Sequence, residues 1–218
     1  MIGVIVPAHN EQALLAQCLG ALHAAARHVE LAGETVRPIV VLDACTDFSG
    51  TIARAYGIET LTTRARNVGV ARAAGAAMML AAGARWLAFT DADSRVSTGW
   101  LVAQLSLDAD AVCGSITVDD WSAHPTSVRD YFLKTYVDAD GHRHVHGANL
   151  GVSADAYVGA GGFPPLACRE DVALVDRLIE SGARIAWSAA PRVITSARSA
   201  ARARGGFGDT LNSWATEG

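Results

Sequence analysis

The sequence of 218 residues lacks the features that mark several large classes of protein. Its four cysteines include no Cys-x-x-Cys pair, so neither a zinc site nor a disulfide framework is indicated. The chain begins without the basic region of a signal peptide, and the alanine-rich stretch 71–84 is too short to span a bilayer. We therefore expect a cytoplasmic protein without a membrane span.

Positive charge is scarce as well. Lys134 is the single lysine, and 18 basic residues face 22 acidic ones, which gives a net charge of −4. A nucleic-acid-binding protein usually carries a basic surplus, so we expect no nucleic-acid partner. No Gly-x-Gly-x-x-Gly or Walker A pattern follows an apolar run, so a dinucleotide cofactor is not indicated. Peripheral membrane association and a homodimer stay open.

Apolar residues are abundant by contrast. Half of the residues are hydrophobic and 18% are charged, which is enough for a large core and argues against disorder. No stretch resembles a linker, so we expect a single domain, residues 1–218. Apolar runs of strand length alternate with helical patterns in the first half, which is typical of a mainly parallel α/β sheet. The strands expected there are 3–6, 38–42, 58–61 and 86–90.

The second half has a less regular pattern. Ser97 or Thr98 is placed to cap a helix that ends at Leu105, as Asn10 is placed to cap the first helix of the chain. An apolar strand at 111–118 is expected to run antiparallel in a mixed sheet. The remaining expected elements are a strand at 147–152, a helix that opens at Arg169, strands at 185–187 and 193–195, and an arginine- and glycine-rich tail.

Two carboxylates, Asp91 and Asp93, end the apolar run 86–90 and are separated only by Ala92. At this spacing they can converge on one divalent cation, and hard cations such as Mg²⁺ or Mn²⁺ prefer oxygen ligands. Mg²⁺ is commonly held by one or two carboxylates together with substrate phosphates, so the pair suggests a metal-bound diphosphate. A solvated aspartate pair that caps a turn explains the same tripeptide.

Polar side chains end the other early strands too. They are Asn10 and Glu11 after the first, Asp43 after the second, and Arg66 and Asn67 after the third. Parallel strands bring these ends to one edge of the sheet, where ligands bind in open α/β folds. Such an edge can hold a nucleotide, with acids bonded to base and ribose and an arginine to phosphate.

These segments together resemble the GT-A-fold nucleotide-sugar glycosyltransferases of family 2. Seven segments carry the resemblance, in the family's order and spacing from end to end of the chain. They are Ile-Val-Pro-Ala-His-Asn-Glu (Ile5 to Glu11), Val-Leu-Asp-Ala-Cys-Thr-Asp (Val41 to Asp47), Ala-Arg-Asn-Val-Gly (Ala65 to Gly69), Thr-Asp-Ala-Asp (Thr90 to Asp93), Gly-Ala-Asn-Leu (Gly147 to Leu150), Gly-Gly-Phe (Gly161 to Phe163) and Glu-Asp (Glu170 and Asp171).

The resemblance implies a Rossmann-like three-layer α/β/α fold with a mixed, mainly parallel central sheet. Residues 1–95 would form its nucleotide-binding half and residues 96–218 its acceptor and catalytic half. The implied activity is an inverting transfer of one sugar from a nucleotide diphosphate sugar, UDP-linked, to an acceptor hydroxyl, with Mn²⁺ or Mg²⁺. The implied nucleotide contacts are Pro7, Ala8, Asn10, Glu11, Asp43, Arg66, Asn67 and Ala92, the metal ligands are Asp91 and Asp93, and the sugar and acceptor pocket includes His146, Gly147 and Asn149.

Asp171 matches the position of the family's catalytic base, and Glu170 is the next candidate. An inverting transfer needs one carboxylate to take the proton of the acceptor hydroxyl while the diphosphate departs. Acidic residues are also common at helix N-termini, because the helix dipole favours negative charge there. The order of the seven segments favours the catalytic interpretation.

Two clusters of basic residues have alternative interpretations. His144 and His146, with His142 before them, can share a strand face and reach metal, phosphate or acceptor, or they can form a solvated loop. Near the end of the chain, arginines can clamp a diphosphate or lie free on the surface. These are Arg198, Arg202 and Arg204.

The sequence also departs from the family pattern. Asp43 stands alone between Leu42 and Ala44 where relatives often have paired acids, which affects the choice of base. The Gln-x-x-Arg-Trp segment of processive synthases is absent, so single-sugar transfer is expected. Two rival functions are a haloacid-dehalogenase-like phosphatase, whose aspartate pair ends the first strand rather than the fourth, and a non-catalytic sugar-nucleotide-binding module, which requires Asp171 to point away from the cleft.

Overall fold

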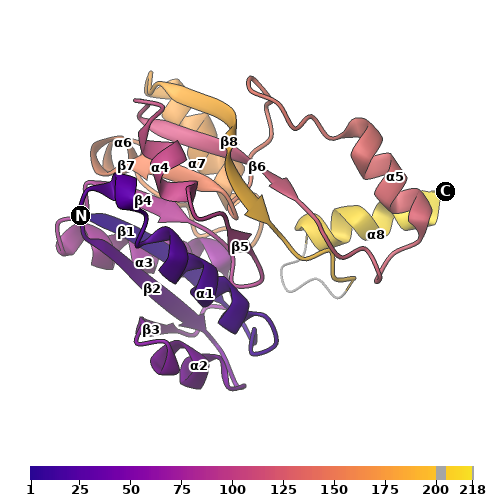
Figure 1. Cartoon of the computed structure of the whole chain (residues 1–218), viewed down its shortest axis with the longest axis horizontal. Helices are drawn as coiled ribbons and strands as arrows, with labels where there is room; N and C mark the ends of the chain where they lie inside the picture. The colour runs from indigo at the N-terminus through magenta and orange to yellow at the C-terminus, as the bar shows by residue number, and fades with distance from the viewer. Residues whose placement is uncertain (200–204, 218) are drawn as a thin grey trace.

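A mixed sheet of eight strands forms the centre of the protein (Figure 1). The structure is a computed structural model that describes residues 1–199 and 205–217. In spatial order the strands are β3 (Glu59–Thr63), β2 (Val36–Asp43), β1 (Ile2–Ala8), β4 (Trp86–Phe89), β7 (Leu150–Ser153), β6 (Ala111–Thr117), β8 (Ile185–Ile194) and β5 (Arg95–Val96).

The strands of the first half are parallel, as predicted. β1 pairs in parallel with β2 and β4, and β2 with β3, so the four carboxyl ends meet at one edge. β7 then runs antiparallel between β4 and β6, β8 is parallel to β6, and β5 is antiparallel to β8. The predicted mixed, mainly parallel sheet is therefore confirmed, but β7 is antiparallel to its neighbours, whereas β6, which was expected to run antiparallel, has the same direction as β4.

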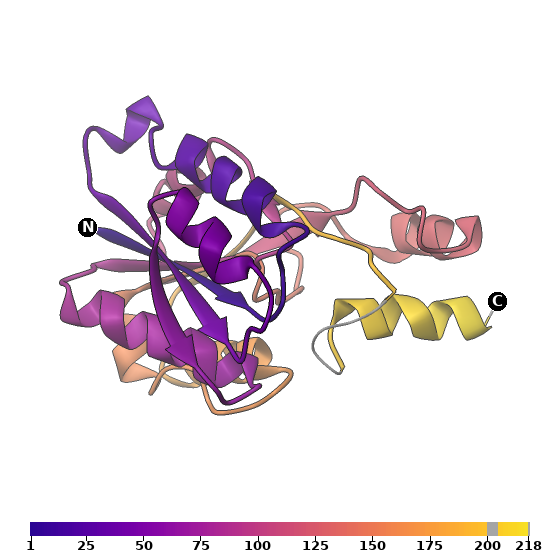
Figure 2. The same ribbon diagram turned by 90° about the horizontal axis from the view of Figure 1, so that it is seen from below.

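Helices cover both faces of this sheet (Figure 2). Their bounds are α1 (Leu15–Ala25), a 3₁₀ turn η1 (Val29–Leu31), α2 (Ser49–Ala55), α3 (Val68–Ala81), α4 (Trp100–Leu105), α5 (Thr126–Thr135), α6 (Ala154–Gly159), α7 (Glu170–Glu180) and α8 (Phe207–Glu217). One core joins α1, α2 and α4 to one face, and a second joins α3, α6 and α7 to the other. In β1, Val4 and Val6 belong to the first core and Ile5 to the second, which is the alternation expected of a strand buried on both faces.

Several element boundaries differ from the predictions. The first helix begins at Leu15 with Leu14 at its N-cap, so Asn10, whose backbone is left-handed with φ 57°, does not cap it. Neither Ser97 nor Thr98 caps α4, which starts at Trp100 after Gly99 with no side-chain cap bond. The strands expected at 185–187 and 193–195 are one strand, β8, which runs through an irregularity in its pairing with β6.

Two helices that were not predicted, α5 and α8, lie side by side away from the sheet (Figures 1 and 2). Val128 and Leu211 form a small core between them with Ala197. The helical spacing of Phe207, Leu211 and Trp214 was present in the sequence, but the arginine- and glycine-rich segment before it concealed the pattern.

Glycines in two helices provide a test of the packing. Gly75 in α3 faces β1 and β2, and a Cβ there would lie 2.6 Å from Cγ2 of Ile5 and 2.9 Å from Cγ2 of Val41. We expect Gly75→Ala to lower the free energy of unfolding by about 1–3 kcal/mol through overpacking. The matched control is Gly20→Ala in α1, where nothing lies within 4 Å, and we expect it to raise stability by about 0.5–1 kcal/mol. Urea unfolding measures both, and equal effects would contradict this account.

Candidate active site

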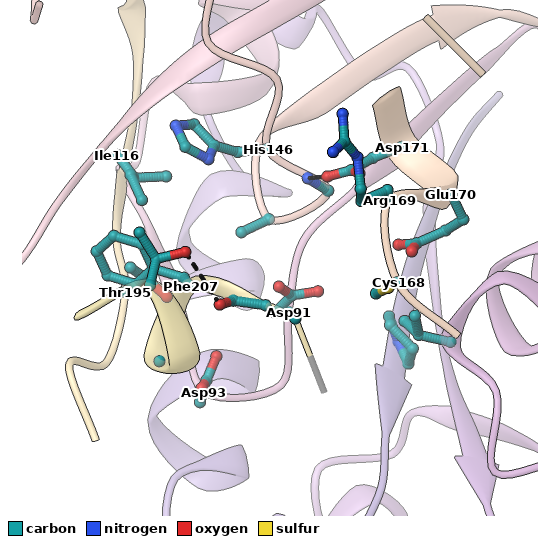
Figure 3. A pocket seen from close by; sticks show the side chains of 18 of the residues that line it. Asp91, Asp93, Ile116, His146, Cys168, Arg169, Glu170, Asp171, Thr195 and Phe207 are labelled. Atoms are coloured by element: carbon teal, nitrogen blue, oxygen red, sulfur yellow. Dashed lines mark hydrogen bonds between the residues drawn. The ribbon is translucent and has the colours of Figure 1, made fainter. Parts of the chain in front are cut away.

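A cavity of about 1010 Å³ opens at the carboxyl ends of the first strands (Figure 3). Thirteen of the fifteen predicted site residues line it. They are Pro7, Ala8, Glu11, Asp43, Arg66, Asn67, Asp91, Ala92, Asp93, His146, Gly147, Glu170 and Asp171. The sequence pattern therefore brings together residues that lie up to 164 positions apart, while two predicted residues, Asn10 and Asn149, do not line this cavity.

Asn149 lies in the core, and the prediction that it lines the acceptor pocket is wrong. Its side chain is fully buried, and Nδ2 donates to the carbonyls of Ser115 at 2.7 Å and Pro191 at 2.9 Å. Its Oδ1 accepts from Nε1 of Trp100 at 2.8 Å. Both N–H groups and the oxygen of this amide are hydrogen-bonded inside the core, so Asn149 joins β6 and β8 to α4.

Asn10 stands beside the cavity rather than in it. Its Oδ1 accepts from the backbone N–H of Thr46 at 2.8 Å, which ties the loop after β1 to the loop after β2. The left-handed backbone of Asn10 suits this short polar side chain. The contribution of Asn10 is therefore to hold two cavity loops together, and its predicted contact with the nucleotide is not supported by its position.

Asp43 organises the third loop of the cavity. Its Oδ1 accepts from Thr63 Oγ1 at 3.0 Å and from the backbone N–H groups of Ala65 and Arg66 at 2.8 and 3.0 Å. Its Oδ2 accepts a single bond, from Asn67 N at 2.7 Å. Since a carboxylate oxygen can accept two bonds, Oδ2 retains capacity for a ligand.

Asn67 begins α3 with its side chain. Its Oδ1 accepts from Val70 N at 3.0 Å and caps the helix, while Nδ2 donates to the carbonyl of Pro165 at 3.0 Å. Arg66, immediately before it, has a left-handed backbone with φ 48° and is exposed in the cavity wall. The cap and the Asp43 bonds together fix the position of the Arg66 backbone.

The two aspartates of the Asp-x-Asp motif are each paired with an arginine. Asp91 Oδ1 lies 2.5 Å from Nη2 of Arg72, and Asp93 Oδ2 lies 3.0 Å from Nη2 of Arg198. Arg198 also binds both carboxylate oxygens of Glu11, each at 2.6 Å. Burial raises the pKa of Asp93 to about 6, with Arg198 acting to lower it and Asp91 and Glu11 to raise it. The negative charge of Asp91, Asp93 and Glu11 is thus concentrated in one place, and Arg72 and Arg198 balance part of it.

The donor set fits a hard divalent cation. Asp91 and Asp93 offer carboxylate oxygens, the ligands that Mg²⁺ and Mn²⁺ prefer, and the Asp91 side chain is 35% exposed to the cavity. Among residues 1–199 and 205–217, no group of three or more histidines, cysteines and acids could hold a metal by itself. A cation held by these two carboxylates would take its other ligands from water or a bound diphosphate.

Arg72 was not predicted from the sequence, although it joins the two acidic parts of the site. It is 3% exposed, and its Nη1 is paired with Glu170 while Nη2 holds Asp91. The backbone at Gly147 passes so close that a Cβ there would lie 2.3 Å from Nη1 of Arg72. A lone arginine among the alanines of α3 was the available signal, since a charge on a buried helix face needs a partner.

The two adjacent acids at the start of α7 have different surroundings. Glu170 is buried against Arg72, and burial raises the pKa of its carboxyl while Arg72 acts to lower it. Asp171 is half-buried, lines the cavity, and accepts from the backbone N–H of Gly147 at 2.7 Å through Oδ2 (Figure 3). Of these two acids, Asp171 is the one that forms no salt bridge with an arginine among the described residues.

His146 is half-buried at the cavity wall, and its ring is neutral. Tyr136 Oη accepts from Ile116 N at 2.9 Å and shares a hydrogen bond of 3.0 Å with His146 Nε2. Burial, with His144 and His142 adding to it, lowers the pKa of His146 to about 3. His142 is buried, whereas His144 and His146 are half-buried, and all three lie in a loop rather than on a strand face.

Comparison with known proteins identifies the family. The model of glycosyl transferase family 2 matches residues 3–157. The chain belongs to this family. Family membership argues against the phosphatase hypothesis. No similar sequence was found among curated proteins.

Solved glycosyltransferases share the fold. TarS of S. aureus in complex with UDP has a TM-score of 0.65 at 15% identity, over 90% of this chain and 61% of that chain. A mannosyltransferase of Pyrobaculum calidifontis with GDP-Man and Mn²⁺ gives 0.65 at 18%, over 94% and 58%. Glucosyl-3-phosphoglycerate synthase of Mycobacterium tuberculosis, with Mn²⁺, UDP and glucosyl-3-phosphoglycerate, gives 0.63 at 16%, over 99% and 76%. The predicted GT-A fold is confirmed, and this chain spans about three fifths of TarS 1–349 and of the mannosyltransferase.

The structure also bears on the question of a membrane span and on the arginines near the end of the chain. Within the parts that the structure describes, no helix is long and apolar enough to cross a membrane. Arg198 lies in the cavity wall and pairs with Glu11 and Asp93, so it is not a free surface arginine. Arg202 and Arg204 fall outside the described residues.

The buried pair of Arg72 and Glu170 gives a stability prediction. We expect Arg72→Met to lower the free energy of unfolding by about 3–5 kcal/mol, because Glu170 is left as an unpaired buried charge. The double variant Arg72→Met/Glu170→Leu removes that charge and should recover most of the loss. The control is Arg37→Met, whose partner Glu59 is 39% exposed, with an expected cost of less than about 1 kcal/mol. Urea unfolding decides, and a double variant as unstable as the single one would contradict the argument.

Proposed function

We propose that the protein is an inverting glycosyltransferase that moves one sugar from a nucleoside diphosphate sugar, UDP-linked, to an acceptor hydroxyl. The observation that carries this proposal is that Asp91 and Asp93 line the same cavity as Asp171, a carboxylate that forms no salt bridge with an arginine among the described residues. An inverting displacement needs positive charge at the leaving diphosphate and a base at the acceptor, and both are available in this cavity.

The nucleotide is assigned to the loops after β1, β2 and β3. Pro7 and Ala8 give the cavity an apolar wall, and Asp43 Oδ2 can accept a bond from an N–H of the nucleobase. Arg66 is exposed in the same cavity and is assigned to the diphosphate. The UDP complex of TarS, which has the same fold, supports a uridine nucleotide. The GDP-Man complex of the mannosyltransferase makes a guanosine nucleotide the second candidate.

A divalent cation, Mn²⁺ or Mg²⁺, is assigned to Asp91 and Asp93. When bound there it neutralises the charge that develops on the departing diphosphate. Arg72 and Arg198 already stand against these carboxylates and add positive charge on the same side of the cavity. The Mn²⁺ complexes of two proteins of the same fold support the choice of metal.

Asp171 is assigned as the general base. The backbone N–H groups of Gly147 and Val172 each bind one of its oxygens, at 2.7 and 2.8 Å, which orients the carboxylate and leaves each oxygen able to accept a proton. Glu170 is committed to Arg72 and is the weaker candidate. The exposure of Asp171 to the cavity also argues against a non-catalytic binding module.

The base assignment predicts a separation of binding from chemistry. We expect Asp171→Asn to keep nucleotide affinity and to lower the rate of sugar transfer by about 10²–10⁴-fold, because an amide accepts the Gly147 bond but no proton. The control is Asp176→Asn on the exposed face of the same helix, which should transfer at the normal rate. Transfer is measured as release of the nucleoside diphosphate in single-turnover experiments. Undiminished transfer by Asp171→Asn would sink the assignment.

The metal assignment predicts that nucleotide binding depends on the cation. Calorimetry should show UDP binding at least tenfold more tightly with Mn²⁺ than with EDTA, and Asp93→Asn should remove this difference, because a single carboxylate leaves the cation mostly water-bound. Asp119→Asn is the control, since that exposed acid pairs with Arg95 outside the cavity. Equal UDP affinity with and without Mn²⁺ would contradict the metal assignment. Tighter binding of GDP than of UDP would change only the assigned nucleobase.

A further inference from the structure

The cavity has two chemically different halves. One half contains the acids and arginines described above, which the proposed function assigns to the donor. The other half is formed by α5, α8, Ile116 of β6 and the segment 144–148. A volume of about 1010 Å³ is at the upper end of the roughly 300–1,000 Å³ of pockets for single small ligands, so the second half has space for another molecule.

Most of this second half consists of aromatic side chains of α5, of α8 and of the residue that follows α5, together with one isoleucine of β6. We call this surface the aromatic wall, and its residues are Ile116, Tyr131, Phe132, Tyr136, Phe207 and Trp214. Tyr131 meets Trp214 edge to face with centroids 4.9 Å apart, and Phe132 meets Phe207 at 6.0 Å. Phe132 also stacks on Tyr136 at 4.7 Å. These contacts hold the rings of the two helices in one continuous surface.

Fixed charge is absent from the aromatic wall among the described residues. The charged residues of α5, which are Arg129, Asp130 and Lys134, do not line the cavity. His146 is neutral, because desolvation lowers its pKa to about 3, and it adds no fixed charge to the wall. The wall therefore combines apolar ring faces with a few neutral polar groups, the hydroxyls of Tyr131 and Thr135 and the His146 ring.

The aromatic wall is continuous with the proposed base. His146 is followed directly by Gly147, whose N–H binds Asp171, and the three residues line the same cavity. Figure 3 shows Ile116, His146 and Phe207 on one side of Asp91, and Asp171 and Glu170 on the other. The wall and Asp171 thus meet through His146 and Gly147, and a molecule on the wall can present a group to Asp171 across the edge of the charged half, where Asp91 lies.

We propose that the aromatic wall is the acceptor subsite, and that the acceptor is an uncharged hydroxyl compound with an aromatic or apolar body. This rests on the proposed function, because it assigns the charged half to the donor. Tyrosine and tryptophan rings bind apolar faces while their polar atoms bind hydroxyls. An anionic acceptor would be desolvated against rings without a counter-charge among the described residues, which is costly. A phosphorylated acceptor is therefore disfavoured.

A set of matched probes tests this proposal without relying on turnover. Phenyl β-glucoside, methyl β-glucoside and phenyl phosphate are titrated into the protein with Mn²⁺ and saturating UDP, and binding is followed by ligand-observed NMR. Phenyl β-glucoside should bind at least fivefold more tightly than each of the others, with the largest saturation on its ring protons. Equal or tighter binding of phenyl phosphate would overturn the uncharged acceptor, and equal binding of methyl β-glucoside would overturn the role of the rings.

Variants of the wall locate the binding. Tyr131→Ala and Trp214→Ala should each weaken phenyl β-glucoside about 3- to 10-fold, as expected for one lost aromatic contact, and should leave UDP affinity within twofold. Tyr131 is 49% exposed, so its truncation should not unfold the protein. The control is Leu133→Ala, an exposed residue of α5 outside the cavity, which should change nothing.

Three further results are distinguishable. Unchanged phenyl glucoside binding in both wall variants would overturn the subsite. If the wild-type protein sediments as a dimer and Tyr131→Ala as a monomer, the wall is an interface between two copies, and the subsite is also overturned. Binding of phenyl β-glucoside by a protein that binds neither UDP nor GDP would instead refute the donor assignment in the proposed function while supporting the wall as a binding site.

Discussion

The buried guanidinium of Arg72 is the interaction on which the rest of the site depends. It holds Asp91, at the end of β4, and Glu170, at the start of α7, so two elements on different sides of the cavity share one cation. A buried charge is tolerated only when it is paired, so Arg72 fixes both acids together. Glu170 precedes Asp171, and the proposed base is therefore positioned through its neighbour. Gly147 completes the arrangement, because only a glycine lets the backbone that binds Asp171 pass the guanidinium.

The same logic governs the loops at the strand ends. Asp43 gathers three backbone N–H groups of the segment after β3, and Asn10 ties its own loop to the next one. Asn10, Ala44 and Arg66 all have left-handed backbones at these ends, a conformation that neighbouring bonds must stabilise. Polar residues at strand ends thus shape the cavity before they meet a ligand, which reduces the entropy cost of binding.

The sequence predicted the parts of the fold that depend on local pattern. Apolar runs gave the parallel strands, and the order of motifs brought the Asp-x-Asp pair and Asp171 to one cavity. Asn149 was misplaced because its motif says nothing about burial: three hydrogen bonds to β6, β8 and α4 draw its amide into the core. Arg72 was missed because its importance comes from two acids 19 and 98 positions away, and no local pattern records such pairing.

The two halves of the cavity also differ in how they are supported. The charged half stands on strand ends that are packed between two large cores, so its geometry is fixed by the sheet. The aromatic wall stands on α5 and α8, which share only the small core of Val128, Ala197 and Leu211. The family match ends at residue 157, before α8 begins. Substitutions in α5 and α8 can therefore alter the aromatic wall while the sheet keeps the charged half intact, which separates the choice of acceptor from the binding of the donor.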